Sequence, residues 1–174
     1  MKTIRFIAPL TAILFVPATW GASVIWDGPT IPFAKPSSAD WTQPANQDRI
    51  TPLVWLTRAD TQGLLNIQSE PAYTHNLSPA GTEWAYGTTA SFSSLTYKNW
   101  EAWTGNNPPG TVGQNAVVHL IGEDIYIDIK FTSWAGAGAG GGFSYVRSTA
   151  PVPEPGSLAL FGTGAFLLSS RRRR

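Results

Sequence analysis

Six carboxylates in the middle of the chain are the side chains that hydrolysis of a glycosidic bond would need. These residues are Glu70, Glu83, Glu101, Glu123, Asp124 and Asp128. The reaction takes two carboxyl groups about 5–10 Å apart in a cleft, one to protonate the leaving oxygen and one to attack or to activate water. Because their spacing forms no motif, a small glycan-active enzyme is an alternative hypothesis only, and no catalytic residue is assigned.

Metal chemistry has little support in the residue types. The chain has no cysteine, which excludes a thiolate metal site and a cysteine nucleophile. The two histidines, His75 and His119, have no partner at the spacing of metal ligands. Oxygen ligands suited to Ca²⁺ occur close together at Asp40, Asn46 and Asp48, but without the spacing of an EF-hand. These three residues are a weak calcium candidate, and we expect no cofactor.

The glycine-rich run at residues 136–141 matches the pattern G-x-G-x-x-G. A dinucleotide site of this pattern requires a helix next, because the helix N-terminus receives the pyrophosphate. Here the run is followed by Phe143, Ser144, Tyr145 and Val146, which favour a strand. We therefore interpret the glycines as a flexible or bulged crossing between two strands.

Tryptophans offer a different kind of site, since an indole presents a large apolar face on which a sugar ring can stack. Trp41, Trp100 and Trp103 lie in or near stretches that are too long for ordinary loops. These stretches are residues 35–49, 68–80 and 104–115. We treat the three tryptophans as a candidate glycan platform, with core packing as the alternative for each of them.

The elements that position these residues are expected to be strands. The clearest pattern is at residues 116–134, where a β-branched run is followed by a short turn and then by strict alternation. In the second half Ile125, Ile127, Ile129 and Phe131 share one face. Period-two alternation is typical of a strand whose one face is buried, so we predict a hairpin here.

Seven more short strands are predicted between turn residues. They are residues 24–26, 31–34, 53–57, 64–67, 83–86, 90–97 and 143–146. Helical periodicity is limited to one or two turns near residues 97–103. This pattern predicts an all-β fold, with a single domain at residues 24–150 built as an antiparallel β-sandwich resembling a jelly roll.

The N-terminal 23 residues have the layout of a secretory signal peptide. Lys2 and Arg5 precede an apolar run at residues 6–16, and small residues end the segment at 21–23. The apolar run is shorter than the roughly 20 residues that a stable membrane span needs. We therefore expect cleavage by signal peptidase and export of the rest of the chain.

The C-terminal segment at residues 151–174 combines three features. Val152, Pro153, Glu154 and Pro155 form an extended segment that a processing enzyme can grip, and a short apolar helix is expected at residues 158–168. Four arginines then end the segment, and the positive-inside rule holds such a cluster on the cytoplasmic side. These residues are Arg171, Arg172, Arg173 and Arg174.

This order resembles the PEP-CTERM sorting signal of Gram-negative bacteria. The resemblance covers only residues 151–174 and extends to no family of known function in the body. It implies that a membrane-embedded exosortase cleaves at Pro-Glu-Pro and that the released protein reaches the cell surface, often alongside exopolysaccharide. The membrane contact of the C-terminal helix would then be transient. A permanently membrane-tethered surface protein is the alternative.

The charge distribution excludes a nucleic-acid partner for the body. Six of the 12 basic residues and one of the 11 acidic residues lie in the two terminal segments, which leaves a net charge of about −4 between them. The favoured hypothesis is an exported, non-catalytic protein of the cell surface or extracellular matrix, associated with exopolysaccharide.

Overall fold

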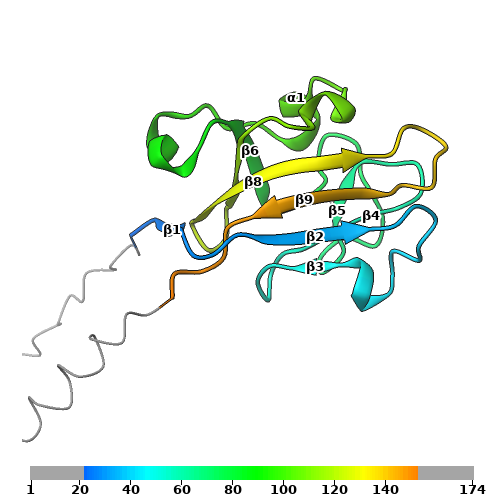
Figure 1. Cartoon of the computed structure of the whole chain (residues 1–174), viewed down its shortest axis with the longest axis horizontal. Helices are drawn as coiled ribbons and strands as arrows, with labels where there is room; N and C mark the ends of the chain where they lie inside the picture. The colour runs from blue at the N-terminus through cyan, green and yellow to red at the C-terminus, as the bar shows by residue number, and fades with distance from the viewer. Residues whose placement is uncertain (1–21, 153–174) are drawn as a thin grey trace, which may run out of the picture.

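The computed structural model describes residues 22–152, which fold into two β-sheets (Figure 1). The strands are β1 (Val24–Trp26), β2 (Ile31–Lys35), β3 (Asp48–Arg49), β4 (Trp55–Arg58), β5 (Leu64–Asn66), β6 (Thr82–Tyr86), β7 (Ala116–Leu120), β8 (Ile125–Trp134) and β9 (Phe143–Arg147). The helices are η1 (Pro44–Asn46), η2 (Thr89–Ser94), α1 (Trp100–Thr104) and η3 (Pro108–Thr111). Nearly all of the predicted signal peptide, and the predicted C-terminal helix with its arginines, lie outside the described residues.

The larger sheet has the strand order β2-β9-β8-β7-β6, and the smaller one has the order β3-β4-β5. These neighbours are antiparallel, whereas β1 pairs with β8 in parallel. The all-β prediction is therefore confirmed, with β1 as an exception to the antiparallel pattern. The strand order does not show a jelly roll, because β6 to β9 follow one another as a meander.

Strand β8 has the alternation that its sequence predicts. Ile127, Ile129 and Phe131 are buried, whereas Lys130 and Thr132 are exposed. A turn joins β8 to its antiparallel partner β7, which confirms the predicted hairpin. On its other side β8 pairs with β9, and the register shifts just after Phe131 as in a β-bulge.

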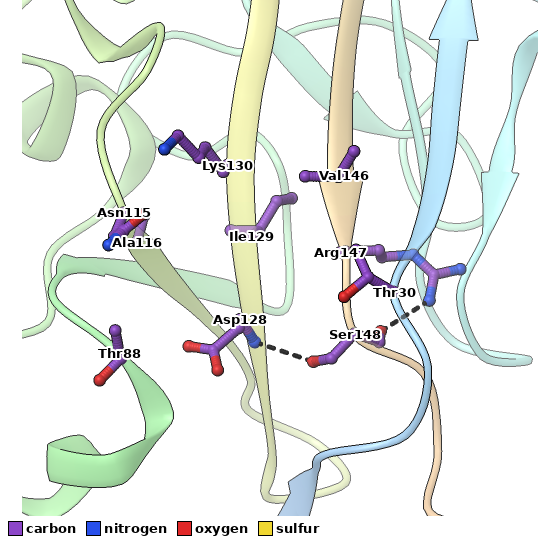
Figure 2. A pocket seen from close by; sticks show the side chains of 10 residues that line it. All are labelled: Thr30, Thr88, Asn115, Ala116, Asp128, Ile129, Lys130, Val146, Arg147 and Ser148. Carbon is purple, nitrogen blue, oxygen red and sulfur yellow. Dashed lines mark hydrogen bonds between the residues drawn. The ribbon is translucent and has the colours of Figure 1, made fainter.

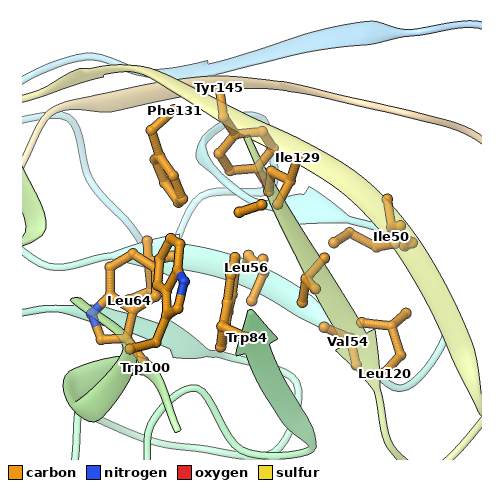
Figure 3. Close-up of a cluster of buried hydrophobic side chains, with 14 of the residues drawn as sticks. Ile50, Val54, Leu56, Leu64, Trp84, Trp100, Leu120, Ile129, Phe131 and Tyr145 are labelled. Carbon is orange, nitrogen blue, oxygen red and sulfur yellow. The ribbon is translucent and has the colours of Figure 1, made fainter. Parts of the chain in front are cut away.

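The hydrophobic core joins the two sheets (Figure 3). Leu56 and Leu64 of the smaller sheet lie in one cluster with Trp84 and Phe131 of the larger sheet, and each is at most 1% exposed. Trp100 on α1 adds to this cluster, with its ring centroid 5.0 Å from that of Trp84 and 5.5 Å from that of Phe131. Large aromatic rings thus supply much of the buried apolar surface that drives folding.

A buried polar cluster also joins the two sheets. The guanidinium of Arg147 on β9 binds the carboxylate of Asp48 on β3 twice, at 2.7 Å from Nε and 2.8 Å from Nη2. The Tyr145 hydroxyl donates to the same carboxylate at 2.6 Å. Burial, together with the charge of Asp48, raises the pKa of Tyr145 well above its ordinary value. Because an unpaired charge in the interior is costly, each group depends on the others.

Two elements differ from the sequence-based expectation. The strand predicted at residues 90–97 is largely the short helix η2, because the backbone N–H and the hydroxyl of Thr89 bind Asp128 at 2.8 and 2.7 Å and hold a turn there. The short helix expected near residues 97–103 is present as α1. Its start is capped by the side chain of Asn99, and Gly105 ends it in the left-handed conformation.

Both ends of the described chain lie at the same end of the domain (Figure 1). Strand β1 pairs with residues 125–127 of β8, and β9 pairs with β8 from Ile129 onward, so the first and last strands follow one another along it. The segments that follow β1 and β9 also contact each other, because the Gly28 N–H donates to the Thr149 carbonyl at 3.0 Å. The two ends of the described chain, near residues 22 and 152, are therefore close together.

The buried Tyr145 phenol should make stability sensitive to alkaline pH. The unfolded chain loses this proton near pH 10 and the folded chain only well above it, so the free energy of unfolding should fall as the pH rises beyond 10. The contribution of Tyr145 approaches about 1.4 kcal/mol per pH unit. Tyr145→Phe should lose about 1–2 kcal/mol at neutral pH and should show a shallower alkaline slope.

Urea denaturation from about pH 8 to about pH 11 measures both effects, since it spans the ordinary tyrosine pKa. Tyr86→Phe is the matched control, because Tyr86 is 47% exposed and burial raises its pKa less than that of the fully buried Tyr145. Identical alkaline slopes in the wild type and Tyr145→Phe would contradict the assignment.

Candidate ligand-binding surface

The outer face of the larger sheet, opposite the core, is only partly covered. The segment that contains η2 lies over β7 and the start of β8, where Thr89 binds Asp128 and the ring of Phe92 lies 4.6 Å from that of Tyr126. The outward side chains of β2, β9 and the second half of β8 remain accessible and are called the outer strip below. They are Pro32, Ala34, Lys130, Thr132, Ser144 and Val146.

A polar hollow lies at one end of the outer strip (Figure 2). Its volume is about 240 Å³, and it opens between the end of β9 and the segment before η2. Hydroxyl, amide, carboxylate and ammonium groups line it, over a floor that includes Val146. The polar residues are Thr30, Thr88, Asn115, Asp128, Lys130 and Ser148.

A second hollow of about 450 Å³ lies farther along the same strands, towards the glycine-rich connection. Ala34, Ser133 and Ser144 line it, and Trp134 contributes to its wall. Ser144 and Val146 are two residues apart on β9, so they point to the same face and the two hollows follow one another along it. From Ser144 to Ser148 the strand spans about 13 Å.

Three hydroxyls form a cluster on the outer strip. Ser144 Oγ lies 2.7 Å from Thr132 Oγ1 and 2.6 Å from Ser133 Oγ, and the bulge in β8 is what places two hydroxyls of that strand opposite one of β9. Each hydroxyl has one donor and two acceptor positions, so the cluster keeps bonding capacity towards solvent. This is the chemistry that hydrogen-bonds the hydroxyl groups of a sugar.

The two charged residues of this surface have different roles. Asp128 is already bound by Thr89, and its backbone N–H donates to Ser148 Oγ at 3.1 Å. Among the described residues Lys130 forms no ion pair, either with Asp128 on the same strand or with another carboxylate. Its exposed ammonium is therefore available to a ligand in the first hollow.

Two of the three tryptophans of the predicted platform are buried and present no exposed ring face. Trp100 is 1% exposed and Trp103 is 5% exposed, because α1 turns both rings onto Trp84, whose ring centroid is 5.0 Å and 5.4 Å from theirs. Trp41, in the loop after β2, remains half-exposed. Exposure of such residues was expected from loop length, but a one-turn helix inside the stretch buries them.

The positions of Asp40, Asn46 and Asp48 give the calcium candidate no support. Asp48 is neutralised by the Arg147 guanidinium, so its oxygens already have a cationic partner. Asp40 accepts hydrogen bonds from the hydroxyl and backbone N–H of Thr42, which lower the pKa of its carboxyl, and Asn46 donates to the Asp40 carbonyl. Within residues 22–152 no cluster of three or more His, Cys, Asp or Glu side chains is placed to hold a metal.

The carboxylates considered for catalysis mostly hold loops in place. Glu70 accepts bonds from the N–H groups of Asn66 and Ala80 at 2.7 and 2.8 Å and from the Ser78 hydroxyl. Glu101 binds the Tyr73 hydroxyl and the N–H of Asn76 in the same way, and Glu123 binds Thr51.

His119 binds two more of these carboxylates, one with each ring nitrogen. Its Nδ1 is 2.8 Å from Glu83 and its Nε2 is 3.1 Å from Asp124, and its ring stacks on that of Tyr126 at 4.1 Å. Glu83 and Trp84 are neighbours on β6, and their side chains point to opposite faces of the strand. Only Asp128 of the six carboxylates lines the outer-strip hollows, so a pair for glycoside hydrolysis is not formed there.

The glycine-rich run joins β8 to β9 as a crossing between strands, as its sequence predicts. Arg58 clamps this connection by donating to the Ala135 carbonyl at 2.9 Å and the Gly142 carbonyl at 3.2 Å. Burial lowers the pKa of Arg58 to about 10. A Cβ on Gly141 would lie 2.0 Å from the Ala59 carbonyl oxygen, so close backbone approach requires glycine there.

A family model of the PEP-CTERM protein-sorting motif matches residues 151–174. The chain carries a PEP-CTERM sorting signal. Such signals are processed by exosortases, so the chain is sorted to the cell envelope or surface, as the sequence indicated. No curated protein and no solved structure matches the chain, and the body outside the PEP-CTERM motif resembles no known family.

The PEP-CTERM motif begins directly where the folded domain ends. Thr149 still pairs with the domain through Gly28 and Pro29, and Val152 is 69% exposed. The remaining sorting residues, Pro153 to Pro155 and the four arginines, lie outside the described residues. Among residues 22–152 no helix has the length and apolar character needed to cross a bilayer.

Two neighbouring residues of β8 should respond differently to truncation. Lys130→Ala should change the free energy of unfolding by no more than about 0.5 kcal/mol, because within residues 22–152 the ammonium forms no ion pair. Asp128→Ala should cost about 1–2 kcal/mol, because two Thr89 donors lose their acceptor. Urea denaturation compares them, and equal costs would show that Lys130 also serves the fold.

Proposed function

We propose that this PEP-CTERM protein is an exported, non-catalytic protein of the cell surface or extracellular matrix that binds exopolysaccharide along the outer strip. The observation that carries the proposal is an uncovered, extended sheet face with two successive hollows, the second of which is lined by a hydroxyl cluster. Polymers suit such a face, because the two hollows follow one another along β9 and can hold successive units of one chain.

The chemistry of the outer strip supports a sugar polymer over a protein partner. Its polar groups are small hydroxyls and one ammonium, and its apolar groups are the short side chains of Pro32, Ala34 and Val146. Protein interfaces instead rely on large buried anchors such as Trp, Tyr and Arg. The aromatic residues of this domain are concentrated on the core face, where they stabilise the fold.

A non-catalytic role is supported by the use of the carboxylates. All six candidates bind backbone N–H groups, hydroxyls or His119, and the hollows of the outer strip contain one carboxylate where hydrolysis needs two. Glycan hydrolysis is therefore not the function that this surface favours.

Processing at both ends is consistent with the fold. Ser23 Oγ donates to the Asp124 carboxylate at 2.8 Å and the Val24 N–H to its carbonyl at 2.9 Å, so signal peptidase cleavage near residues 21–23 would leave an N-terminus anchored on the β7–β8 turn. Exosortase cleavage at Pro-Glu-Pro would release the domain beyond Thr149. Membrane contact through the C-terminal helix would then be transient.

Affinity electrophoresis of the purified protein in gels containing the extracellular polysaccharide of the exporting cells tests the proposal. The wild type should be retarded. The double variant Lys130→Ala/Thr132→Ala should bind about tenfold more weakly, since it removes the free ammonium and one hydroxyl of the cluster.

Arg49→Ala is the matched control, because it removes an exposed positive charge from the smaller sheet and should leave retardation unchanged. Absence of retardation of the wild type, or equal retardation of the wild type and the double variant, would overturn the proposal.

A further inference from the structure

A separate pocket of about 470 Å³ lies beside β6, at the opposite edge of the larger sheet from β2. It is formed by the end of β6, the segment before α1 and α1 itself. Its lining combines two aromatic rings, one aliphatic side chain, two hydroxyls and one ammonium. These residues are Tyr86, Ser94, Leu95, Thr96, Lys98 and Trp103.

The indole N–H of Trp103 marks this pocket as unusual. Trp103 is buried, with 5% of its surface exposed. Its Nε1 is the one buried side-chain nitrogen or oxygen of the described residues that has no hydrogen-bond partner. Other indoles are satisfied: Trp55 donates to the Thr51 carbonyl and Trp84 to the Thr82 hydroxyl, both at 3.0 Å. Buried donors are almost always paired, so this N–H needs an acceptor from outside the chain, and Trp103 lines the pocket from which one can approach.

The other lining groups define the ligand. Tyr86 is 47% exposed, and its ring lies 4.9 Å from that of Trp103, which gives an apolar face for a flat or ring-shaped molecule. Leu95 extends this face. An ionised phosphate or sulfate alone would leave these apolar groups without a partner, whereas a sugar ring covers them.

Lys98 supplies a positive charge on a backbone segment that is held in place. Its backbone is held on both sides by Trp84, with bonds of 2.8 and 2.9 Å, and among the described residues its ammonium forms no ion pair. A carboxylate on the ligand would form an ion pair with this ammonium. Because residues 24–150 carry a net charge of about −4, a densely charged polyanion is repelled, and a ligand with an isolated carboxylate fits better.

We propose that this pocket binds a uronic acid unit, with the sugar ring on Tyr86, the carboxylate on Lys98 and a ring or hydroxyl oxygen accepting from the Trp103 indole. The site is independent of the outer strip, and its ligand can be a chain end or an isolated uronate within a neutral polymer. The hydroxyls of Ser94 and Thr96 remain as partners for the sugar hydroxyls.

Titration of the ¹⁵N-labelled protein with methyl glucuronide, followed by its indole N–H resonances in NMR spectra, tests this site. The Trp103 indole resonance should move, whereas those of Trp55 and Trp84 should stay, because both are already bonded within the protein. Methyl glucoside, which lacks the carboxylate, should bind at least about fivefold more weakly. Added salt should reduce this difference in affinity, because it screens the attraction between the Lys98 ammonium and the carboxylate.

Variants separate the pocket from the outer strip. Lys98→Ala should remove the preference for the glucuronide over the glucoside. Tyr86→Ala should weaken the binding of both sugars about tenfold, whereas Tyr86→Phe keeps the ring and should retain binding. Lys130→Ala should leave this titration unchanged, so failure of one site is distinguishable from failure of the other. A near-UV circular dichroism spectrum like that of the wild type confirms that each variant is folded.

Three results would overturn the proposal. They are no shift of the Trp103 indole at saturating glucuronide, equal affinity for the charged and the neutral sugar, and unchanged binding in folded Lys98→Ala and Tyr86→Ala variants.

Discussion

The bonds among Asp48, Arg147 and Tyr145 are the constraint on which the rest of the structure depends. They cross from the smaller to the larger sheet in the interior, where each polar group is tolerated only because the others satisfy it. Since Tyr145 and Arg147 point inward, the alternating residues Ser144 and Val146 must point outward. The cluster that joins the sheets therefore also fixes the orientation of β9, and with it the outer strip.

Most other polar groups of the domain serve the same structural purpose. Glu70 and Glu101 gather the N–H groups of the long stretch after β5, and Arg58 clamps the carbonyls at both ends of the glycine-rich connection. This use of charge explains how a cysteine-free domain with many long loops keeps them in one conformation. Lys98 and Lys130 differ from these residues, because among the described residues their ammonium groups form no ion pair.

Local patterns in the sequence were sufficient for much of the fold. The alternation in β8, the strand after the glycine run and the sorting signal all depend on neighbouring residues, and they were predicted correctly. Contacts between distant residues were not predictable in this way. Asp48 was placed in a loop and considered for calcium, because nothing near it in the chain indicates that Arg147 neutralises it. Similarly, the short helix near residues 97–103 was predicted, but nothing in its local sequence indicates that the rings of Trp100 and Trp103 pack on Trp84.

The central claim is that the uncovered face of β2, β9 and β8 is where exopolysaccharide binds. The most direct measurement is a map of backbone amide shifts on addition of hexasaccharides prepared from the extracellular polysaccharide of the exporting cells. The account predicts that the largest shifts follow the outer strip, from Ser148 through Val146 and Ser144 and across to Lys130. Saturating oligosaccharide that leaves these amides unchanged would contradict it.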